Sequence, residues 1–525
     1  MPLCSIKNGG DTTKINCHEG QTVHSFLTVN KIYLDAPCAG RGVCGKCAVR
    51  ISGEFSPAGD AEKKLLGSKI NDGFRLACHT FILGDCAIEL DESTYAIKTD
   101  IESETQLYPS PYTKKFAKQN CAAVGMAADI GTTTVAVFFY NLITGRHLYT
   151  ASCLNPQKAF GADVMSRIEL CVNDSENVKI LHGIIINALN VLANEFSQNT
   201  DIKKEFICDC VIAGNTTMQL LAHGLDPASL GASPFIPQSL FGCEVKSRDI
   251  GLNIPGNTYF MPAIGGFLGG DITACLLSRD FDRIKHDAFL IDIGTNGEMA
   301  LLSSGKIIAC STAAGPAFEG AKIRFGTGSI NGAIKSFKLE DGLKTETIGN
   351  APPRGICGSG LIDAAAEFVR ERLIDETGRI DEDYEGSYKN LICDTQDGLS
   401  LALTEDKSIY LTSRDIRELQ LAKAAIRAGA ITLLKSADSE SAAGFIAGGF
   451  GSAINLKSAA VLGLLPKELS FNAQAIGNAA GSGAVKCLLS RKNRTRAQKI
   501  ADNVQVIDLS VNKIFEEEFI EGMMF

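Results

Sequence analysis

Two short stretches of nearly the same sequence carry side chains suited to phosphate chemistry. Residues 129–134 read Asp-Ile-Gly-Thr-Thr-Thr, and residues 292–297 read Asp-Ile-Gly-Thr-Asn-Gly. In both, an apolar run ends in an acid and a tight glycine turn, and a second apolar run follows. Glycine lets the backbone approach a ligand closely, while successive amides and hydroxyls donate to phosphate oxygens. An acid at the end of a strand can hold Mg²⁺ through its waters. We therefore interpret both stretches as phosphate-binding hairpins.

A single acid–glycine turn is more often a plain hairpin, so this interpretation depends on recurrence. The two copies begin 163 residues apart, and a Gly-Gly-Phe-Gly loop follows a short apolar run at residues 448–451. Repetition at this spacing indicates an internal duplication. Together the three segments favour a nucleotide site over isolated turns.

A second set of residues that could do chemistry consists of cysteines. Cys38, Cys44 and Cys47 lie within ten residues on a glycine-rich loop, and Cys78 follows 31 residues after the last of them. Thiolates are ligands for zinc and for iron–sulfur clusters. Structural zinc sites usually pair two knuckles of two thiolates, whereas three clustered ligands and one distant ligand are typical of a [2Fe–2S] ferredoxin. The spacing favours the cluster, and the alternatives are zinc or a structural loop without a ligand.

The composition is that of a multi-domain globular protein. The chain has 525 residues, of which 45% are hydrophobic and 21% are charged. Its apolar runs are of strand length and its amino terminus is polar, so we expect neither a membrane span nor a secretory signal. We therefore expect a cytoplasmic protein whose 18 cysteines are reduced. The net charge of -9 argues against a nucleic acid partner, and the basic run at residues 491–496 is interpreted as a solvated helix end.

Three segments of different character position these residues. Residues 1–91 contain short alternating strands and are interpreted as a small β-rich domain. Residues 92–120 lack apolar periodicity and contain acids, hydroxyl residues and two prolines, which predicts a flexible linker. Residues 121–525 alternate strands and helices, which predicts an α/β domain.

The duplication predicts two similar groups of three strands in this α/β domain. The strands of its two β-β-β units are expected at Ala122–Asp129, Val135–Tyr140 and His147–Cys153, and again at Ala288–Asp292, Met299–Ser303 and Ile307–Ser311. Helices are expected at Gly161–Gln198 and Ile416–Ala437.

Residues 1–91 resemble the [2Fe–2S] ferredoxins, with Cys38, Cys44, Cys47 and Cys78 at the ligand positions. The gap of five residues between the first two ligands differs from the four of the plant-type pattern. It is similar to that of the bacterial and mitochondrial ferredoxins that serve monooxygenases. The resemblance implies a β-grasp-like α+β domain with a cluster on these four thiolates.

Residues 121–525 resemble the superfamily of actin, sugar kinases and heat-shock chaperone ATPases. The resemblance rests on the two hairpins, 129–134 and 292–298, and on an adenosine motif at 447–451. It implies a duplicated, RNase H-like fold whose two lobes close on ATP and Mg²⁺, with Asp129 and Asp292 positioning the metal. The candidate nucleotide-binding residues are Gly131, Thr132, Thr133, Thr134, Gly294, Thr295, Asn296, Gly297, Glu418, Lys423, Gly448 and Gly449.

Three of the candidate roles have alternatives. Asp271 is the candidate for the acid that orients the attacking water, and its alternative is a cap for a helix over Ile272–Ser278. Glu418 and Lys423 would reach ribose or adenine, and their alternative is a solvated helix face.

A ferredoxin followed by such an ATPase resembles the ATP-dependent reductive activators of corrinoid proteins, over nearly the whole chain. The runs that carry this resemblance are residues 155–157, 161–168, 214–218 and 414–423. It implies that one electron passes from an external donor through the cluster to cob(II)alamin on a partner corrinoid protein, which regenerates cob(I)alamin for methyl transfer. ATP would drive this reduction, and a homodimer is compatible with it. The linker is shorter than in larger relatives, which argues against a docking surface on an intervening module.

Three other functions fit the same two modules. An ATP-driven activator of another low-potential enzyme, such as a radical dehydratase, would usually hold a four-iron cluster between two subunits. A redox-sensing, chaperone-like ATPase would deliver no electron in response to ATP. A small-molecule kinase would yield a phosphorylated product.

Overall fold

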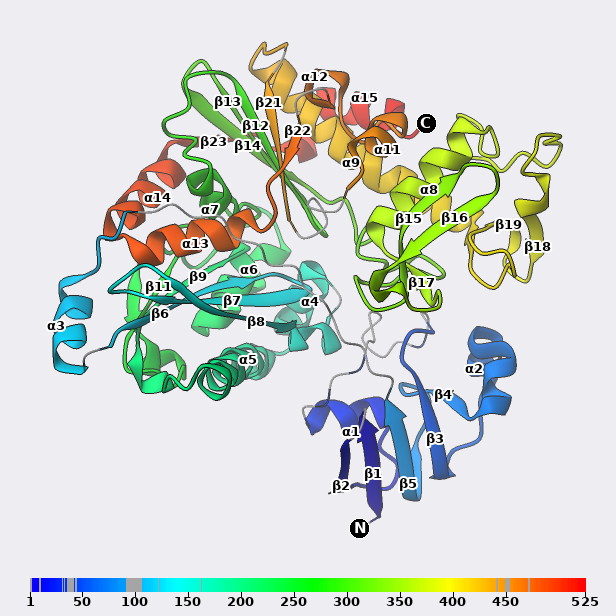
Figure 1. Ribbon diagram of the computed structural model, residues 1–525, viewed down its shortest axis with the longest axis horizontal. Helices are drawn as coiled ribbons and strands as arrows, with labels where there is room; N and C mark the ends of the chain where they lie inside the picture. The colour runs from blue at the N-terminus through cyan, green and yellow to red at the C-terminus, as the bar shows by residue number, and fades with distance from the viewer. Residues whose placement is uncertain are drawn as a thin grey trace. The chain divides into compact units, whose positions relative to one another are not determined.

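The computed structural model divides the chain into two compact units. Described residues are 2–8, 11–30, 32, 34, 42, 45–90, 106–120, 122–161, 163–440, 442–448, 454–470 and 473–525. The first unit comprises residues 1–94 and 154–177, and the second comprises residues 95–153 and 178–525 (Figure 1).

The first unit is built on a five-stranded sheet of order β2-β1-β5-β3-β4. β1 and β5 are parallel, and the other neighbours are antiparallel. Val23, Phe26 and Leu27 of α1 pack in one apolar core with the buried side chains of the strands, as a β-grasp-like domain requires. The elements of this unit are β1 Leu3–Asn8, β2 Asp11–Asn16, β3 Ala48–Phe55, β4 Phe74–Leu76, β5 Ile82–Leu90, α1 Val23–Val29, α2 Asp60–Leu66 and α4 Val164–Asn173.

The second unit contains the predicted duplication, as two six-stranded sheets. Their orders are β10-β11-β9-β6-β7-β8 in the first lobe and β22-β21-β12-β13-β14-β23 in the second lobe. In each, an antiparallel hairpin, β6–β7 or β12–β13, has its first strand paired in parallel with a later strand, β9 or β21. The repeated unit expected from the sequence is therefore confirmed.

The strands of the first lobe are β6 Val124–Ile130, β7 Thr134–Asn141, β8 His147–Leu154, β9 Ile207–Gly214, β10 Glu244–Lys246 and β11 Asn257–Phe260. Those of the second lobe are β12 Ala288–Ile293, β13 Gly297–Ser303, β14 Lys306–Thr312, β21 Ala443–Ala447, β22 Ala473–Ala475 and β23 Val504–Val506. Two three-stranded sheets are inserted after β14, and their strands are β15 Ala333–Leu339, β16 Leu343–Thr347, β17 Gly355–Ile356, β18 Ile392–Thr395, β19 Gly398–Ala402 and β20 Tyr410–Thr412.

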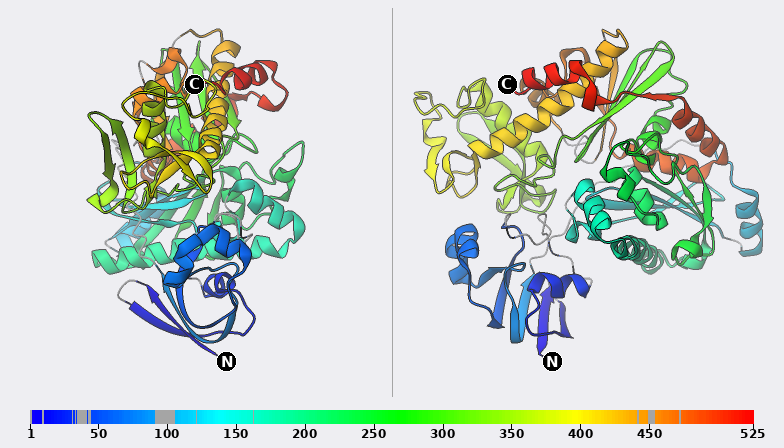
Figure 2. Two further views of the ribbon diagram at one scale, coloured as in Figure 1. Left: turned by 90° about the vertical axis from the view of Figure 1, so that its right-hand side faces the viewer. Right: turned by 180° about the vertical axis from the view of Figure 1, so that it is seen from behind.

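The helices of the second unit include two that lie between the sheets, α7 and α13 (Figures 1 and 2). One apolar core joins these helices to side chains of both sheets, among them Phe138 of β7 and Leu290 of β12. A side chain at Gly483 of α13 would approach the Ala274 carbonyl of α7 to 2.0 Å, so the two helices are in very close contact. The helices are α3 Pro111–Asn120, α5 Glu176–Thr200, α6 Thr216–His223, α7 Gly270–Ser278, α8 Gly358–Arg370, α9 Ser413–Ser436, α11 Leu456–Val461, α12 Lys467–Ser470, α13 Ala479–Leu489, α14 Arg491–Asn503 and α15 Lys513–Glu521.

The linker predicted for residues 92–120 differs from the structure in its second half, which is the helix α3. The Ser110 hydroxyl accepts from the Thr113 amide at 2.9 Å and caps the helix, while Pro111 occupies its first turn. Tyr112 donates to the Pro255 carbonyl at 3.2 Å, which ties α3 to the first lobe. Residues 92–105 of the predicted linker lie outside the described residues.

The helical stretch predicted for Gly161–Gln198 consists of two helices, α4 and α5. The chain leaves the helical conformation at Asp174, whose carboxylate accepts from the Glu176 amide at 3.0 Å and so starts the second helix. By length and composition alone, α5 is apolar enough to cross a bilayer, which the apolar runs of the sequence did not indicate. Its Phe196 is buried and stacks on Phe139, with ring centroids 4.4 Å apart, as in a core helix.

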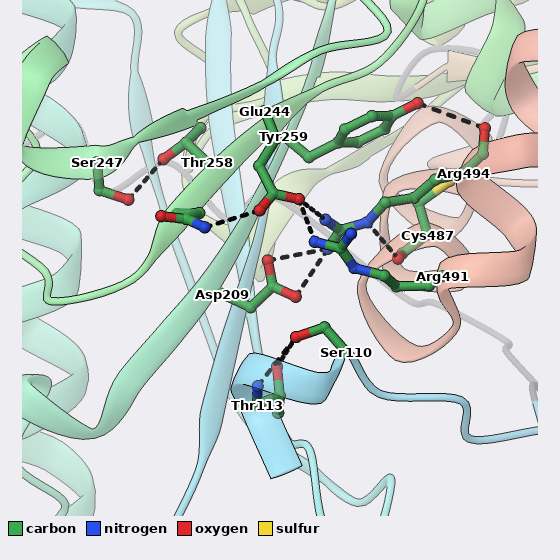
Figure 3. Close-up of polar contacts among 11 residues, drawn as sticks. Ser110, Thr113, Asp209, Glu244, Ser247, Thr258, Tyr259, Cys487, Arg491 and Arg494 are labelled. Carbon is green, nitrogen blue, oxygen red and sulfur yellow. Dashed lines mark hydrogen bonds and ion pairs between the residues drawn. The ribbon is translucent and has the colours of Figure 1, made fainter. Parts of the chain in front are cut away.

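The basic run at residues 491–496 is not a solvated helix end, because Arg494 is only 6% exposed. Figure 3 shows its guanidinium aimed at Asp209 of β9 and Glu244 of β10. Arg494 Nη2 donates to both oxygens of Asp209 at 2.9 and 2.8 Å, and Nη1 donates to Glu244 at 3.0 Å. The ion pairs attach α14 to the first lobe, and β23, which follows α14, then pairs with β14 of the second lobe. The run therefore helps to connect the two lobes.

Replacing Arg494 with Met should destabilise the second unit by about 3–5 kcal/mol, because the buried Asp209 carboxylate would lose its partner. Urea denaturation followed by circular dichroism measures this change. Arg248→Met is the matched control, since Arg248 is exposed and pairs with the exposed Asp249. Equal unfolding midpoints for the two variants would contradict the structural role of Arg494.

Candidate nucleotide and cluster sites

In both predicted phosphate hairpins an acid lies at the end of a strand and a glycine turn follows, although the two turns close with different spacing. Asp129 lies one residue before the end of β6, and Asp292 lies one residue before the end of β12. The Gly131 amide donates to the Thr134 carbonyl at 2.8 Å, and the Gly294 amide donates to the Asn296 carbonyl at 3.0 Å. These bonds close the turns that follow the two acids, as the sequence predicted.

Four carboxylates gather where the lobes meet: Asp129, Asp271, Asp292 and Glu298. Burial raises the pKa of Asp129 to about 7, that of Asp271 to about 8 and that of Asp292 to about 6. Burial also raises the pKa of Glu298 well above its usual range, and the charges of the three aspartates add to the shift. Buried carboxylates whose common ionisation is unfavourable favour a hard divalent cation nearby, which they can hold through its waters.

The partners of the two hairpin aspartates fix their orientation. Asn478 Nδ2 donates to Asp129 Oδ2 at 2.9 Å, and the Cys275 thiol lies 3.6 Å from Asp292 Oδ2. Cys275 is on α7 and Asn478 caps α13, so the two helices between the sheets reach both acids. Movement of these helices is therefore coupled to the aspartates.

Asp271 belongs to this group of acids and is not the helix cap that the sequence offered as its alternative. The residue that caps α7 is Gly269, and Asp271 lies within the first turn. Its carboxylate accepts from the Ile272 amide at 2.8 Å. Burial is the main cause of its raised pKa, and the charge of Asp292 adds to the shift. Its role as the acid that orients water stays a prediction.

The threonines of the hairpins contact residues that the sequence did not predict. Thr133 and Thr295 both donate to Glu319, each at 2.8 Å, and Asn215 Nδ2 donates to Thr132 Oγ1 at 3.2 Å. The sequence analysis did not identify Glu319, and it included Asn215 in the run 214–218 without assigning it a contact, because each residue meets its threonine only through the fold.

Glu298 was within the predicted motif but had no assigned role. β12 and β13 pair with Asp292 directly opposite Glu298, which places both side chains on one face of the sheet. Counting residues across the hairpin would have found it. Its burial, at 6% exposed, makes it part of the acid group.

Among the predicted adenosine residues that the structure describes, Gly448 lies beside the acid group, whereas Glu418 and Lys423 contact other partners. Gly448 lies beside Asp292, because a side chain there would come within 2.5 Å of Asp292 Oδ1, while Gly449 lies outside the described residues. Glu418 pairs with Lys322 at 3.5 Å. Lys423 donates to the Met524 carbonyl and lies over the Phe525 ring, 5.0 Å from its centroid. At 1% exposed, Lys423 is not on the solvated face that was its alternative, and burial lowers its pKa to about 8.

Two of the four predicted cluster ligands lie side by side in the first unit. The sulfurs of Cys47 and Cys78 are 3.3 Å apart, while Cys38 and Cys44 lie outside the described residues. Gly42 has a φ of +73°, and a side chain there would come within 1.8 Å of His79 Nε2, so glycine suits this position. Two adjacent sulfurs fit part of the ligand arrangement of an iron–sulfur cluster.

A buried ion pair holds Cys78 beside Cys47. Glu62, 1% exposed, accepts from Arg75 at 3.0 and 2.8 Å and from the Leu76 amide at 2.9 Å. Burial alone would raise the pKa of Glu62, but these hydrogen bonds outweigh it and lower the pKa. The next amide, that of Ala77, donates to the Cys47 carbonyl at 2.9 Å. Glu62 thus fixes the segment that carries Cys78.

Replacing Glu62 with Gln should leave Arg75 without its charge partner and loosen the Cys78 segment. We expect a lower iron content per chain and faster loss of visible absorbance on exposure to a chelator. Glu89→Gln is the control, because Glu89 forms an exposed pair with Lys7 in the same sheet. Unchanged iron content and the same rate of loss in both variants would contradict this role.

The acid group predicts how stability depends on pH in the absence of metal and nucleotide. The folded protein keeps protons on Asp129, Asp271 and Asp292 up to about pH 7, 8 and 6, whereas the unfolded chain loses them near its usual aspartate pKa of about 4. Because the folded state binds more protons, these groups stabilise it most below about pH 4, and this stability falls as pH rises to about 8.

Urea midpoints in EDTA between about pH 5 and 8 measure this loss. Asp271→Asn should show a shallower decline, because its side chain stays neutral throughout. The same slope in both proteins would remove Asp271 from the acid group.

The comparisons with known proteins agree with this geometry. A family model described as the C-terminal domain of RACo, the ASKHA domain, matches residues 287–525, and one described as the RACo middle region matches residues 124–284. A model of the 2Fe-2S iron-sulfur cluster binding domain matches residues 6–83. The boundary between the first two models falls between the first lobe and the second.

Individual relatives cover most of the chain. "Corrinoid activation enzyme RamQ" of Eubacterium limosum is 35% identical over 426 residues, which span 76% of this chain and 70% of that protein. "[Co(II) methylated amine-specific corrinoid protein] reductase" of Methanosarcina barkeri is 26% identical over 381 residues, which span 65% of this chain and 66% of that protein.

Among solved structures, "Reductive activator for corrinoid,iron-sulfur protein" is 30% identical and covers 99% of this chain and 98% of its own, with a TM-score of 0.71. The predicted fold class, a ferredoxin domain followed by an actin-like ATPase fold, is thereby confirmed. The chain therefore belongs to the RACo family of reductive activators of corrinoid proteins, in which a [2Fe–2S] domain is joined to an ASKHA ATPase domain.

Proposed function

We propose that this protein reduces the cob(II)alamin of a partner corrinoid protein to cob(I)alamin in a reaction driven by ATP. One electron enters from an external reductant, which is oxidised, and one electron leaves to the cobalt. The observation that carries the proposal is the combination, in one chain of this family, of the cysteine loop and the acid group at the duplicated hairpins.

The first unit would hold the cluster through Cys38, Cys44, Cys47 and Cys78. When bound, the [2Fe–2S] cluster supplies a one-electron carrier of low potential. The chain's own contribution is to fix the ligands, and the contact of Ala77 with Cys47 supports this, since it ties one predicted ligand segment to the other.

The second unit would hold ATP and Mg²⁺ between its lobes. Asp129 and Asp292 would orient the metal, and the hydroxyls of Thr132, Thr133 and Thr295 would donate to phosphate oxygens. Among the residues that the structure describes, no three such side chains converge closely enough to hold a metal ion by themselves. Mg²⁺ would therefore be bound partly through water, which suits an ion that keeps much of its hydration.

ATP is needed because a one-electron transfer to an acceptor of lower potential is unfavourable by a factor of ten for each 59 mV. Nucleotide binding offsets this only if it changes the environment of the acceptor, which requires a conformational link between the sites. The helices α7 and α13 are suitable for such a link, because they contact the acid group and lie in the core that joins both lobes.

The proposal predicts that cob(I)alamin forms only when the acid group is intact and ATP is present. With a corrinoid methyltransferase protein in the Co(II) state and a chemical reductant, the visible spectrum should show cob(I) on addition of Mg²⁺ and ATP. Asp292→Asn should lower ATP hydrolysis and cob(I) formation by at least about tenfold while the cluster spectrum is unchanged. Asp249→Asn is the control, since Asp249 is exposed and pairs with Arg248.

Cob(I) formed equally without ATP would refute the proposed coupling. Full activity of Asp292→Asn would refute the assignment of the second hairpin as a phosphate and metal site.

A further inference from the structure

Glu319 contacts both phosphate hairpins at once. Its Oε2 accepts from Thr133 Oγ1 at 2.8 Å, and its Oε1 accepts from Thr295 Oγ1 at 2.8 Å. Thr133 lies between β6 and β7 of the first lobe, and Thr295 lies between β12 and β13 of the second lobe. One carboxylate thus joins one hydroxyl from each copy of the duplicated motif, although the two are not at corresponding positions, since Thr295 aligns with Thr132.

The backbone around Glu319 is fixed to the second lobe. The preceding residues, Ala317 and Phe318, are 2% and 3% exposed and belong to the core of that lobe. The following residue, Gly320, has a φ of +75°, and a side chain there would come within 2.4 Å of the Thr327 amide nitrogen. The contact with Thr295 therefore lies within one lobe, whereas the contact with Thr133 crosses to the other.

We propose that Glu319 is a positioning residue that competes with the phosphate chain of the nucleotide for the hydroxyls of Thr133 and Thr295. Each hydroxyl has one proton and can donate to one acceptor at a time. An ionised carboxylate and a phosphate are both anionic acceptors, so they exclude each other from the same donors and repel each other at close range. The inference rests on the proposed nucleotide site.

The competition has two consequences. It weakens nucleotide binding and speeds release, because phosphate contacts form only when the carboxylate withdraws. It also couples nucleotide binding to a contact between the lobes. When the Glu319 carboxylate withdraws, the hydrogen bond between Thr133 and the second lobe breaks, and when the carboxylate returns, this bond forms again. Glu319 thus links nucleotide occupancy to the relation between the lobes without contacting the nucleotide itself.

Calorimetric titration of the full chain with Mg²⁺ and a non-hydrolysable ATP analogue tests this inference. Glu319→Ala should bind the analogue more tightly than the parent, on the order of tenfold, which is the size of one charge-assisted hydrogen bond. Glu319→Gln should lie between them, because its side chain is neutral and its NH₂ group donates where a carboxylate oxygen accepted. Glu346→Ala is the control, since Glu346 forms an exposed pair with Lys335 on the same lobe.

A purely structural role predicts the opposite sign, because a disturbed site binds more weakly. Thermal midpoints of the same variants identify any loss of folding, and Glu319→Gln decides the result if Glu319→Ala does not fold. In a Thr133→Val background the gain from Glu319→Ala should shrink, because one contested donor is gone.

Equal or weaker binding by folded Glu319 variants would overturn the inference and leave the nucleotide site standing. Absence of binding by the parent chain would overturn the nucleotide site and this inference together.

Discussion

The constraint on which the rest of the second unit depends is the burial of four carboxylates in one place. Burial raises the pKa of Asp129, Asp271, Asp292 and Glu298, and the charges of neighbouring aspartates add to the shifts of all but Asp292, so their common ionisation is unfavourable without a cation. The proposed metal ion and phosphate groups would compensate this charge. These acids are brought together by the duplicated hairpins and by the helices α7 and α13 between the sheets. The two helices are in close contact at Gly483 and Ala274.

The same arrangement explains how occupancy of one site can alter contacts in both lobes. Each hairpin belongs to its own sheet, yet Asn478 before α13 holds Asp129, and Cys275 of α7 contacts Asp292. Glu319 adds a direct bond between the hairpins. A change in what occupies the site therefore alters contacts on both lobes, which is the physical requirement for coupling ATP to a distant redox event.

Much of the fold and part of the site could be predicted from the sequence, because those parts are encoded locally. The hairpins, their glycine turns and the cysteine loop are short patterns whose chemistry can be inferred from neighbouring residues. The positions of most strands and helices could be predicted from the same local patterns. The helix α3 was missed because its stability comes from the Ser110 cap and from packing, not from an apolar stripe. Arg494 was misread because its partner, Asp209, is 285 residues away in the sequence. Glu319, the partner of Thr133, lies 186 residues away, and Asn478, the partner of Asp129, lies 349 residues away. Patterns among neighbouring residues could not have predicted these contacts.

The central claim is that ATP moves an electron to a cobalt centre that the reductant alone does not reduce. The most direct test is the equilibrium fraction of cob(I)alamin in the partner at a fixed, measured reductant potential. The account predicts that this fraction, with Mg²⁺ and ATP, exceeds the value set by the potential difference at about 59 mV per factor of ten. Without ATP it should equal that value. The same fraction under both conditions would contradict the account.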